Sequence, residues 1–428
     1  MTRSVSPYGT VRRALLATVL VLPSAVPSAA GEAPGTAAAG AGPAEAGAPG
    51  AVSAVRVGRL FTGTETLTPG VVVIAGGRVV SVGRDLPPSV GAGRVVDLPG
   101  AFSTPGWIDA ASTTGLAGAD AEMTREVTPC VRALRAFDPA SRGARRALSS
   151  GVTSLFLAPG GANVVGGIAS VVKTSPGPGG RPRTVREEAA LKIAFGAEPS
   201  GGNFPAHGIP ANIYARRPTT RMGVLAVLRD AWILGRLAGP GSPDADLAAM
   251  ARAAAGEIPV RALARHAEDL RTVLRVKEDL GISPVVEGVS EGYLVADRLA
   301  GAGLGCVVGP LQHPVSGRGP EGTDPAMDNA GALHRAGVRI ALTAGGDAAG
   351  LRDQAAMAAR CGLPRDAALS AVTAAAAELS GVADRVGTLA KGKDADLVVF
   401  DGDPLETSSR VRLVVVDGEV VFEREAGK

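Results

Sequence analysis

The stretch Ser103-Thr-Pro-Gly-Trp-Ile-Asp-Ala110 lies where one kind of sequence pattern gives way to another. Before it, short runs rich in β-branched residues are separated by turn residues. After it, roughly from residue 105 to 384, apolar runs alternate with alanine-rich amphipathic stretches. The octapeptide therefore marks a junction between a β-rich segment and a longer α/β segment.

The segment before the junction is predicted to form β-strands. Gly76-Gly77 separates two of its apolar runs and is a two-residue hairpin signal, because glycine adopts positive φ without steric cost. The expected strands are 55–60, 70–75, 78–83 and 94–98.

The C-terminus repeats this pattern. Strands are expected at 395–400, 411–416 and 419–423, and Asp417-Gly418 is a strong hairpin signal between the last two. Neither terminal set is large enough to form a sandwich alone. We therefore predict one small composite β-sandwich built from residues 54–104 and 385–428, with everything between inserted into it.

The middle segment, 105–384, is predicted to form a (β/α)8 TIM-like barrel, because alternation of strands and helices is typical of a parallel sheet. No Gly-x-Gly-x-x-Gly follows a strand, which argues against a dinucleotide-binding fold. The clearest expected strands are 153–157, 285–287, 305–308 and 338–343, and the clearest expected helices are 187–195, 223–236 and 267–279.

Composition limits the classes of function. The chain has 428 residues, 46% hydrophobic and 20% charged, with a formal net charge of +3, which is typical of a globular protein. It shows no basic stripe interleaved with aromatic residues, so a nucleic-acid partner is not expected. Cys130, Cys306 and Cys361 lie far apart with no Cys-x-x-Cys pair, which fits buried apolar residues, although one disulfide is possible in an exported chain.

The first thirty residues have the pattern of a signal peptide. Arg3, Arg12 and Arg13 precede the apolar run 14–22, and Ser28 and Ala30 are small residues suited to a cleavage site. The run is too short to span a bilayer. We predict a signal peptide at 1–30, a flexible Ala/Gly/Pro linker at 31–53, and a periplasmic or extracellular protein. An uncleaved anchor is the alternative, and the choice between the general secretory and twin-arginine routes stays open.

Several motifs, taken in order, resemble the amidohydrolase superfamily of metal-dependent hydrolases, in its imidazolonepropionase-like branch. The junction octapeptide is similar to the superfamily's Pro-Gly-x-Ile-Asp-x-His-x-His signature, which opens the barrel. The resemblance covers about residues 54–424. Its other motifs are Gly151-Val-Thr-Ser154, Pro159-Gly-Gly-Ala-Asn-Val-Val-Gly-Gly167, Val171-Val-Lys173, Ala190-Leu-Lys-Ile-Ala-Phe-Gly196, Thr220-Arg-Met-Gly223, Ala383-Asp-Arg-Val-Gly-Thr-Leu-Ala-Lys-Gly-Lys-Asp-Ala-Asp-Leu397 and Asp401-Gly-Asp-Pro404.

The resemblance implies hydrolysis of non-peptide C–N bonds by zinc or another divalent metal at the C-terminal ends of the barrel strands. It also implies histidine ligands at five positions of this chain, none of which is histidine. Those positions carry Ala111, Thr113, Leu263, Arg265 and Gly288. Methyl, isobutyl and glycine side chains cannot bind a metal, and Arg265 brings a fixed positive charge. We therefore expect no metal cofactor.

Other residues are candidates for remnants of a site. Asp347 is the candidate for the family's last-strand aspartate. His266 is one residue out of register with the ligand positions and is expected to face away from the barrel lumen. His207 and His313 lie in Gly/Pro-rich loops that can overhang the barrel mouth, and His334 lies on a predicted surface helix.

Four residues are predicted to line a pocket: Asn163, Lys173, Arg221 and Arg265. Lys173 ends an apolar run where some family members carry a carboxylated lysine, and Asn163 belongs to a glycine-rich loop whose backbone N–H groups can face an anion. Structural roles are the alternative for each. Glu187-Glu188 is interpreted as part of a solvated helical face.

Three functional hypotheses remain open. The leading one is a degenerate, non-catalytic exported homologue, in effect a pseudoenzyme, which binds a small molecule, forms a homo-oligomer or pairs with an active relative. The second is an active hydrolase with a shifted ligand set of Asp347, His266, His313 and Lys173. The third is a structural or interaction protein of the cell envelope. The sequence identifies no substrate.

Overall fold

The computed structural model describes residues 52–424, except 89, 91–93, 117, 119, 202, 204–215 and 312–325. The predicted signal peptide, most of the predicted linker, His207 and His313 therefore lie outside the described residues. All described residues belong to one compact unit.

Strands and helices follow the pattern expected on both sides of the junction. The strands are β1 Val52–Phe61, β2 Thr66–Leu67, β3 Gly70–Ala75, β4 Arg78–Gly83, β5 Arg94–Pro105, β6 Trp107–Ser112, β7 Val152–Leu157, β8 Val165–Lys173, β9 Thr184–Ala194, β10 Val260–Ala264, β11 Val285–Gly288, β12 Cys306–Val308, β13 Ile340–Leu342, β14 Leu397–Phe400, β15 Val411–Val416 and β16 Glu419–Glu423. The helices are α1 Arg142–Ser149, α2 Arg221–Ala238, α3 Ala245–Ala254, α4 Ala267–Leu280, α5 Ala296–Gly301, α6 Asn329–Arg335, α7 Leu351–Arg360, α8 Arg365–Ala371 and α9 Ala374–Leu379.

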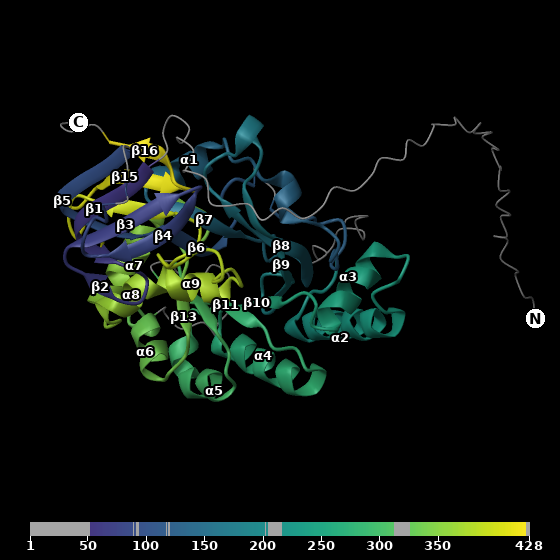
Figure 1. Cartoon of the computed structure of the whole chain (residues 1–428). Coiled ribbons are helices and arrows are strands. Elements are labelled where there is room, and N and C mark those ends of the chain that lie inside the picture. Colours follow the sequence, from purple (N-terminus) through teal and green to yellow (C-terminus); the bar gives the residue numbers. More distant parts are fainter. Residues whose placement is uncertain are drawn as a thin grey trace, which may run out of the picture. The chain divides into compact units, whose positions relative to one another are not determined.

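The strands of the two ends of the chain combine, as predicted, and they do so in one sheet. Its strand order is β16-β15-β14-β5-β1-β3-β4, with β2 paired to β1, so C-terminal strands lie directly beside N-terminal ones (Figure 1). Both predicted hairpin turns have the backbone that their residues favour. Gly76 and Gly77 have φ of 56° and 75°, and Asp417 and Gly418 have φ of 50° and 74°, as two-residue hairpin turns of type I′ require.

The composite sheet encloses its own core. Val55, Val72, Leu397 and Val415 come from four of its strands and pack in one buried cluster. The two hairpin turns also meet, since the Ala395 N–H donates to the Gly77 carbonyl and the Gly418 N–H to the Ala395 carbonyl. The sheet is therefore rolled so that its two ends face each other, and the N-terminal strands cannot bury their apolar face without the C-terminal ones.

The second sheet is a nearly closed barrel. Its eight strands follow the chain in order from β6 to β13, and a bridge between Ser112 and Gly345 brings its two ends together. Helices α4, α5 and α6 lie outside the later strands (Figure 1). This arrangement confirms the predicted TIM-like fold with a second sheet.

The barrel departs from the expected all-parallel order at β8. This strand runs antiparallel to both β7 and β9, whereas the other neighbouring strands are parallel. Only residues 158–164 and 174–183 connect β8 to its neighbours, and a parallel crossover needs a longer connection, usually a helix. The C-terminal end of β8 therefore lies at the opposite end of the barrel from the other strand ends.

The helix expected at 187–195 is wrong, because residues 187–194 belong to β9. Residues 189–194 are all buried, so both faces of the strand are covered, and a fully buried strand lacks the alternation that distinguishes it from a helix. The Glu188 carboxylate accepts hydrogen bonds from Arg132 and Arg252 rather than belonging to a solvated helical face. The helices expected at 223–236 and 267–279 are confirmed as α2 and α4.

The junction octapeptide connects the two sheets through close packing. The Trp107 indole N–H donates to the Thr104 hydroxyl at 2.9 Å, and the Trp107 ring lies 5.5 Å from that of Phe400 in β14. A Cβ at Gly106 would lie 2.1 Å from Thr153 Oγ1 in β7. Glycine is required at this point because the chain passes directly against a barrel strand.

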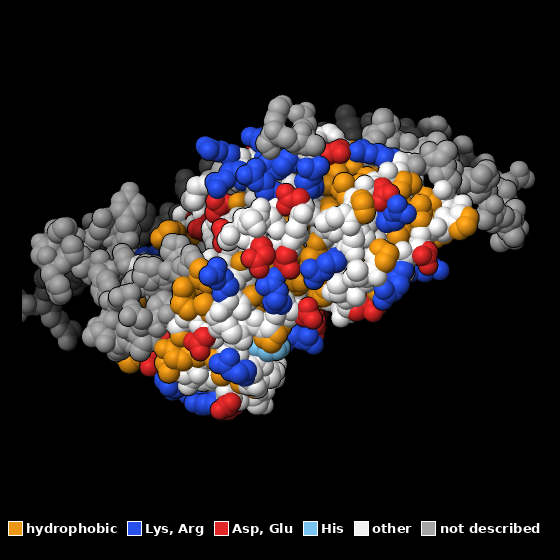
Figure 2. Space-filling model, turned by 90° about the vertical axis from the view of Figure 1, so that its left-hand side faces the viewer, with side chains coloured by type: hydrophobic (Ala, Val, Ile, Leu, Met, Phe, Trp, Pro, Cys, Tyr) orange, Lys and Arg blue, Asp and Glu red, His pale blue; other side chains and the backbone are white. Residues whose placement is uncertain are grey.

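The surface mixes charges of both signs with apolar side chains. On the face shown in Figure 2, lysine and arginine side chains gather along one edge, with acidic side chains close by. No helix of the described residues is long and apolar enough to span a membrane. All three cysteines are free, so the structure contains no disulfide among them.

Candidate functional site

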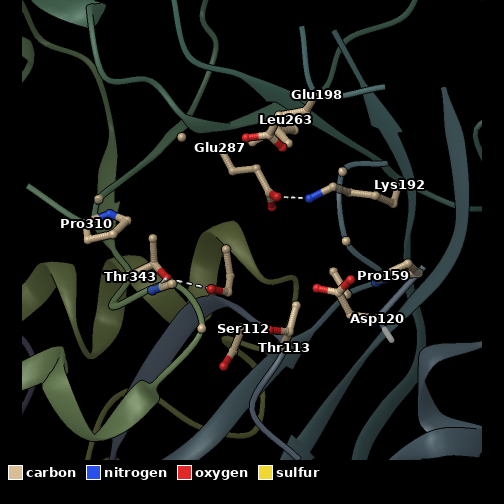
Figure 3. Close-up of a pocket in the computed structure, with 18 of the residues that line it drawn as sticks. Ser112, Thr113, Asp120, Pro159, Lys192, Glu198, Leu263, Glu287, Pro310 and Thr343 are labelled. Atoms are coloured by element: carbon tan, nitrogen blue, oxygen red, sulfur yellow. Dashed lines mark hydrogen bonds and ion pairs between the residues drawn. The ribbon is translucent and has the colours of Figure 1, made fainter. Parts of the chain in front are cut away.

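A pocket of about 280 Å³ opens at the end of the barrel where the parallel strands finish. Ala111 and Ser112 reach it from β6, Lys192 from β9, Leu263 from β10, and Glu287 and Gly288 from β11. Thr343, directly after β13, and the loop residues Gly160 and Gly161 complete much of the wall (Figure 3). Active sites of (β/α)8 barrels lie at this C-terminal end.

Four of the five charged side chains that line the pocket form two ion pairs, and the fifth is Asp120. The Lys192 ammonium and the Glu287 carboxylate point toward each other and form an ion pair (Figure 3). Arg265 forms a second ion pair with Glu198. Lys192 and Glu287 are only 3% and 5% exposed, so their pair is shielded from bulk water.

Arg261 lies beneath this pair and is almost fully buried. Its guanidinium lies 3.9 Å from the centre of the Phe156 ring, donates to the Leu379 carbonyl at 3.0 Å, and lies 4.0 Å from Glu287. Burial lowers the pKa of Arg261 to about 9. A further buried cation therefore lies close to the Lys192–Glu287 pair, outside the lining of the pocket.

The environment of Lys192 disfavours its charged form. Burial lowers its pKa to about 7, the nearby charges of Arg261 and Arg265 act in the same direction, and Glu198 and Asp120 oppose them. An ordinary lysine has a pKa of about 10.4. Lys192 is therefore the titratable amine of this pocket.

Glycines shape the wall where carboxylates approach the backbone. A Cβ at Gly160 would lie 2.5 Å from Asp120 Oδ1, and one at Gly161 would lie 2.3 Å from Glu198 Oε2. The Gly160 N–H also donates to the Asp120 carbonyl at 2.8 Å. These two glycines therefore let Asp120 and Glu198 approach the lumen.

Comparison with known proteins shows a close relative. A crystal structure of an amidohydrolase from Thermotoga maritima is similar with a TM-score of 0.78 and 32% sequence identity, over 87% of this chain and all of that one. The chain belongs to the amidohydrolase family. The family's sequence model also matches residues 321–422.

Two further similarities are weaker, one because it covers a short stretch and the other because its sequence identity is low. The amidohydrolase tasK of Hapsidospora irregularis is 41% identical over 70 residues, which are 16% of this chain and only 7% of that much longer protein. A structure of a molinate hydrolase has a TM-score of 0.55 at 15% identity, over 88% of this chain and 99% of that one, and shows the fold alone.

In this amidohydrolase, all five positions where the family resemblance implies histidine line the pocket. They carry Ala111, Thr113, Leu263, Arg265 and Gly288. A carbon side chain at Gly288 has little room, because a Cβ there would lie 3.1 Å from both Arg265 and Leu263 and its φ is +88°. None of the five is a histidine or a carboxylate, and Thr113 contributes only a hydroxyl group.

Of the four residues predicted to line a pocket, Arg265 does so and three lie elsewhere. Asn163 donates to the Thr128 hydroxyl and the Glu122 carbonyl and accepts from Arg216. Arg221, at the start of α2, donates to Asp269 at 2.9 Å. Both side chains hold loops and helices together outside the pocket lining.

Lys173 lies at the opposite end of the barrel, because β8 runs antiparallel. Its buried ammonium pairs with Asp394 at 2.8 Å, with Asp396 at 3.0 Å and with Asp417. The lysine at the mouth is Lys192 instead.

The candidate remnants of a metal site are dispersed. The Asp347 carboxylate faces Arg146 at 3.1 Å and is half exposed. His266 precedes α4 and lies 3.3 Å from Glu291, and His334 is on α6. Of the shifted ligand set, Asp347, His266 and Lys173 each have a separate partner outside the pocket, and His313 lies outside the described residues.

Sequence reasoning missed Lys192, Glu287, Glu198 and Asp120. Lys192 belongs to the stretch Ala190-Leu-Lys-Ile-Ala-Phe-Gly196 that carries the resemblance, and reading that stretch as a helix concealed its place at a strand end. Glu287 ends an apolar run that was expected as a strand, and a charged residue at a barrel strand end is a usable signal for a site. Glu198 and Asp120 lie in loops with no such signal.

Proposed function

We propose that this chain is an exported member of the amidohydrolase family that binds a small organic ligand in its barrel pocket without a catalytic divalent metal. The observation that carries the proposal is the pocket wall itself. None of the five expected histidine positions carries a histidine or a carboxylate, and two internal ion pairs line the same pocket.

The residues present do not fit a catalytic metal. Such a site takes about three protein ligands and one open position, and no group of three or more His, Cys, Asp or Glu side chains suited to a metal is found within the described ranges. Glu287 and Glu198 offer oxygens, but each already pairs with a basic side chain, Lys192 and Arg265 respectively, which leaves Asp120 as the one further carboxylate in the wall. A cation would have to displace two ion pairs and approach the fixed charge of Arg265.

The pocket suits a small and largely uncharged molecule. Its volume of about 280 Å³ lies just below the usual range for ligand sites, about 300–1,000 Å³. Hydroxyl groups of Ser112, Thr113 and Thr343 line it beside apolar surface from Ala111 and Leu263. Because four of its five charged side chains form ion pairs with one another and only Asp120 has no such partner, a strongly charged ligand would gain little there.

Export is the second part of the proposal. It is supported by the order of basic, apolar and small residues in 1–30, which is typical of secretory signal peptides. A periplasmic or extracellular protein follows from it. Pairing with an active homologue or with another copy remains a proposal that rests on the replaced ligands alone.

Elemental analysis of protein purified without chelator tests the absence of a metal. We expect less than one equivalent of zinc or manganese, and no uptake after incubation with either ion. Arg265→His is the matched single restoration, and it should not recover binding because four further positions still lack a ligand. A stoichiometric, tightly held metal in the unaltered protein would contradict the proposal.

A pocket-filling variant tests ligand binding. Thr113 lines the pocket and is partly exposed, so Thr113→Trp should close the mouth without entering the core. In native mass spectrometry with a library of small neutral compounds, we expect binders of the unaltered protein to be lost in this variant. Equal binding by both proteins would place the ligands outside the pocket.

A further inference from the structure

Lys192 places a primary amine inside the barrel pocket. Its side chain leaves the end of β9 and reaches toward Glu287 across the lumen (Figure 3). The residue is 3% exposed, so the amine is reached through the pocket of about 280 Å³ and not from the outer surface.

Two features of the surroundings favour a neutral amine, against the carboxylates of Glu287, Glu198 and Asp120, which favour the ammonium. Burial removes water that would stabilise an ammonium, and the cations of Arg261 and Arg265 lie nearby. These are the two conditions that activate lysine as a nucleophile toward carbonyl compounds. Burial and these cations lower the pKa of Lys192 to about 7, so its neutral form is far more accessible at neutral pH than that of an ordinary lysine, whose pKa is about 10.4.

The chain contains a contrasting buried lysine. Lys173 is equally buried, but it faces Asp394, Asp396 and Asp417. Burial alone would lower its pKa, yet the surrounding carboxylates outweigh that effect and raise it. Lys173 therefore remains a structural cation, which makes it an internal reference for burial without activation.

We propose that Lys192 is a carbonyl-reactive amine that forms a Schiff base with a small neutral aldehyde or ketone bound in the barrel pocket, with Glu287 as its proton acceptor and donor. This inference rests on the proposed function, because it takes the pocket to be a ligand site without a metal. It adds the class of ligand and the atom that reacts.

The reaction balances without any further reagent. The Lys192 nitrogen attacks the carbonyl carbon, the new C–N bond forms, and the carbonyl electron pair moves to oxygen. The nitrogen loses a proton to the Glu287 carboxylate, and the oxygen gains one. The resulting carbinolamine then loses its hydroxyl group with a proton, as one water molecule, and a C=N bond remains.

Reductive trapping with propanal tests the assignment on the full mature chain. Borohydride delivers hydride to the imine carbon and a proton reaches the nitrogen, which leaves a stable propyl-lysine that peptide mapping locates. The chain has six lysines, so each serves as a comparison in the same sample. At pH 7 we expect modification of Lys192 to exceed that of Lys173, Lys277 and Lys391 by at least about tenfold, with a pH dependence that rises through about 7.

Lys192→Arg is the control variant, because it keeps a cation opposite Glu287 but cannot form an imine. It should remain folded and lose the pocket modification, while labelling of the other lysines stays unchanged. Preferential labelling of exposed lysines in the unaltered protein, with Lys192 unmodified, would overturn the inference. This readout comes from the unaltered chain and holds even if the variant fails to fold.

Metal analysis of the same preparation separates this inference from the proposed function. If the protein holds no metal and Lys192 is unmodified, the Schiff-base inference is wrong and the proposal of a metal-free pocket still stands. Protein that holds a stoichiometric metal and still shows modified Lys192 would overturn the metal-free pocket and retain the reactive amine.

Discussion

Replacing Lys173 by methionine should loosen the connection between the barrel and the composite sheet. Lys173 ends β8 of the barrel, and its three carboxylate partners belong to the segment before β14 and to the turn between β15 and β16. The side chain is 2% exposed. Methionine has a similar length, so the change removes the charge while largely keeping the packing.

The expected loss of unfolding free energy in Lys173→Met depends on which cations still pair with the three carboxylates. Asp394 keeps Arg78 and Arg385, and Asp417 keeps Arg183. Asp396 is left without a cation, although it still accepts the Asp417 N–H at 2.9 Å. Breaking a buried ion pair from one side costs about 3–5 kcal/mol, and because only one carboxylate is stranded we expect about 3 kcal/mol.

The loss of stability caused by Lys173→Met should increase with pH. Burial raises the pKa of Asp396, and the charge of Lys173 counteracts part of that rise. Lys173→Met removes the positive charge that counteracts this rise. The Asp396 carboxyl group therefore keeps its proton to a higher pH in the folded state than in the unfolded state. A group of this kind contributes stability below its unfolded pKa of about 3.9, and loses it as pH rises through the folded value. The deficit should therefore be smaller at pH 5 than at pH 8.

Urea unfolding at pH 5 and pH 8 measures both effects. Lys391→Met is the exposed control and should change the free energy of unfolding by no more than about 0.5 kcal/mol. Adding Asp396→Asn to Lys173→Met should recover part of the loss, since a neutral amide needs no cation. A loss below about 1 kcal/mol at pH 8, or one that does not vary with pH, would refute the role assigned to Lys173.

Three further predictions concern the fold and the predicted signal peptide. Deletion from Leu389 onward should prevent folding, because β14 pairs with β5 and fills both cores; a stable proteolytic fragment ending near residue 384 would contradict this. Gly106→Ala should destabilise by about 1–3 kcal/mol, because its Cβ would lie 2.1 Å from Thr153 Oγ1, whereas Gly83→Ala meets no atom within 4 Å and should be near neutral in thermal unfolding. Exported protein should begin near Gly31, and intact-mass measurement of a mature chain that starts at Met1 would exclude cleavage.

Much of the architecture was predictable from local sequence. Gly76-Gly77 and Asp417-Gly418 identified two hairpins because few other residues adopt their backbone. The strand runs on either side, and the helices at α2 and α4, followed from apolar periodicity. The need of the terminal strands for each other followed from their number, since neither group alone can cover an apolar face.

The contents of the candidate site required the tertiary structure. A strand buried on both faces carries no periodic pattern, so the sequence did not distinguish β9 from a helix, and Lys192 was not recognised at its end. The sequence does not show that the short connections on either side of β8 make it run antiparallel to its neighbours. That direction places Lys173 at the end of the barrel opposite the pocket. The sequence by itself determined that histidine is absent from five positions, because residue identity is local information. Only the tertiary structure decided that those positions share one pocket with Lys192 and Glu287, because the ends of strands distant in sequence meet only when the barrel closes.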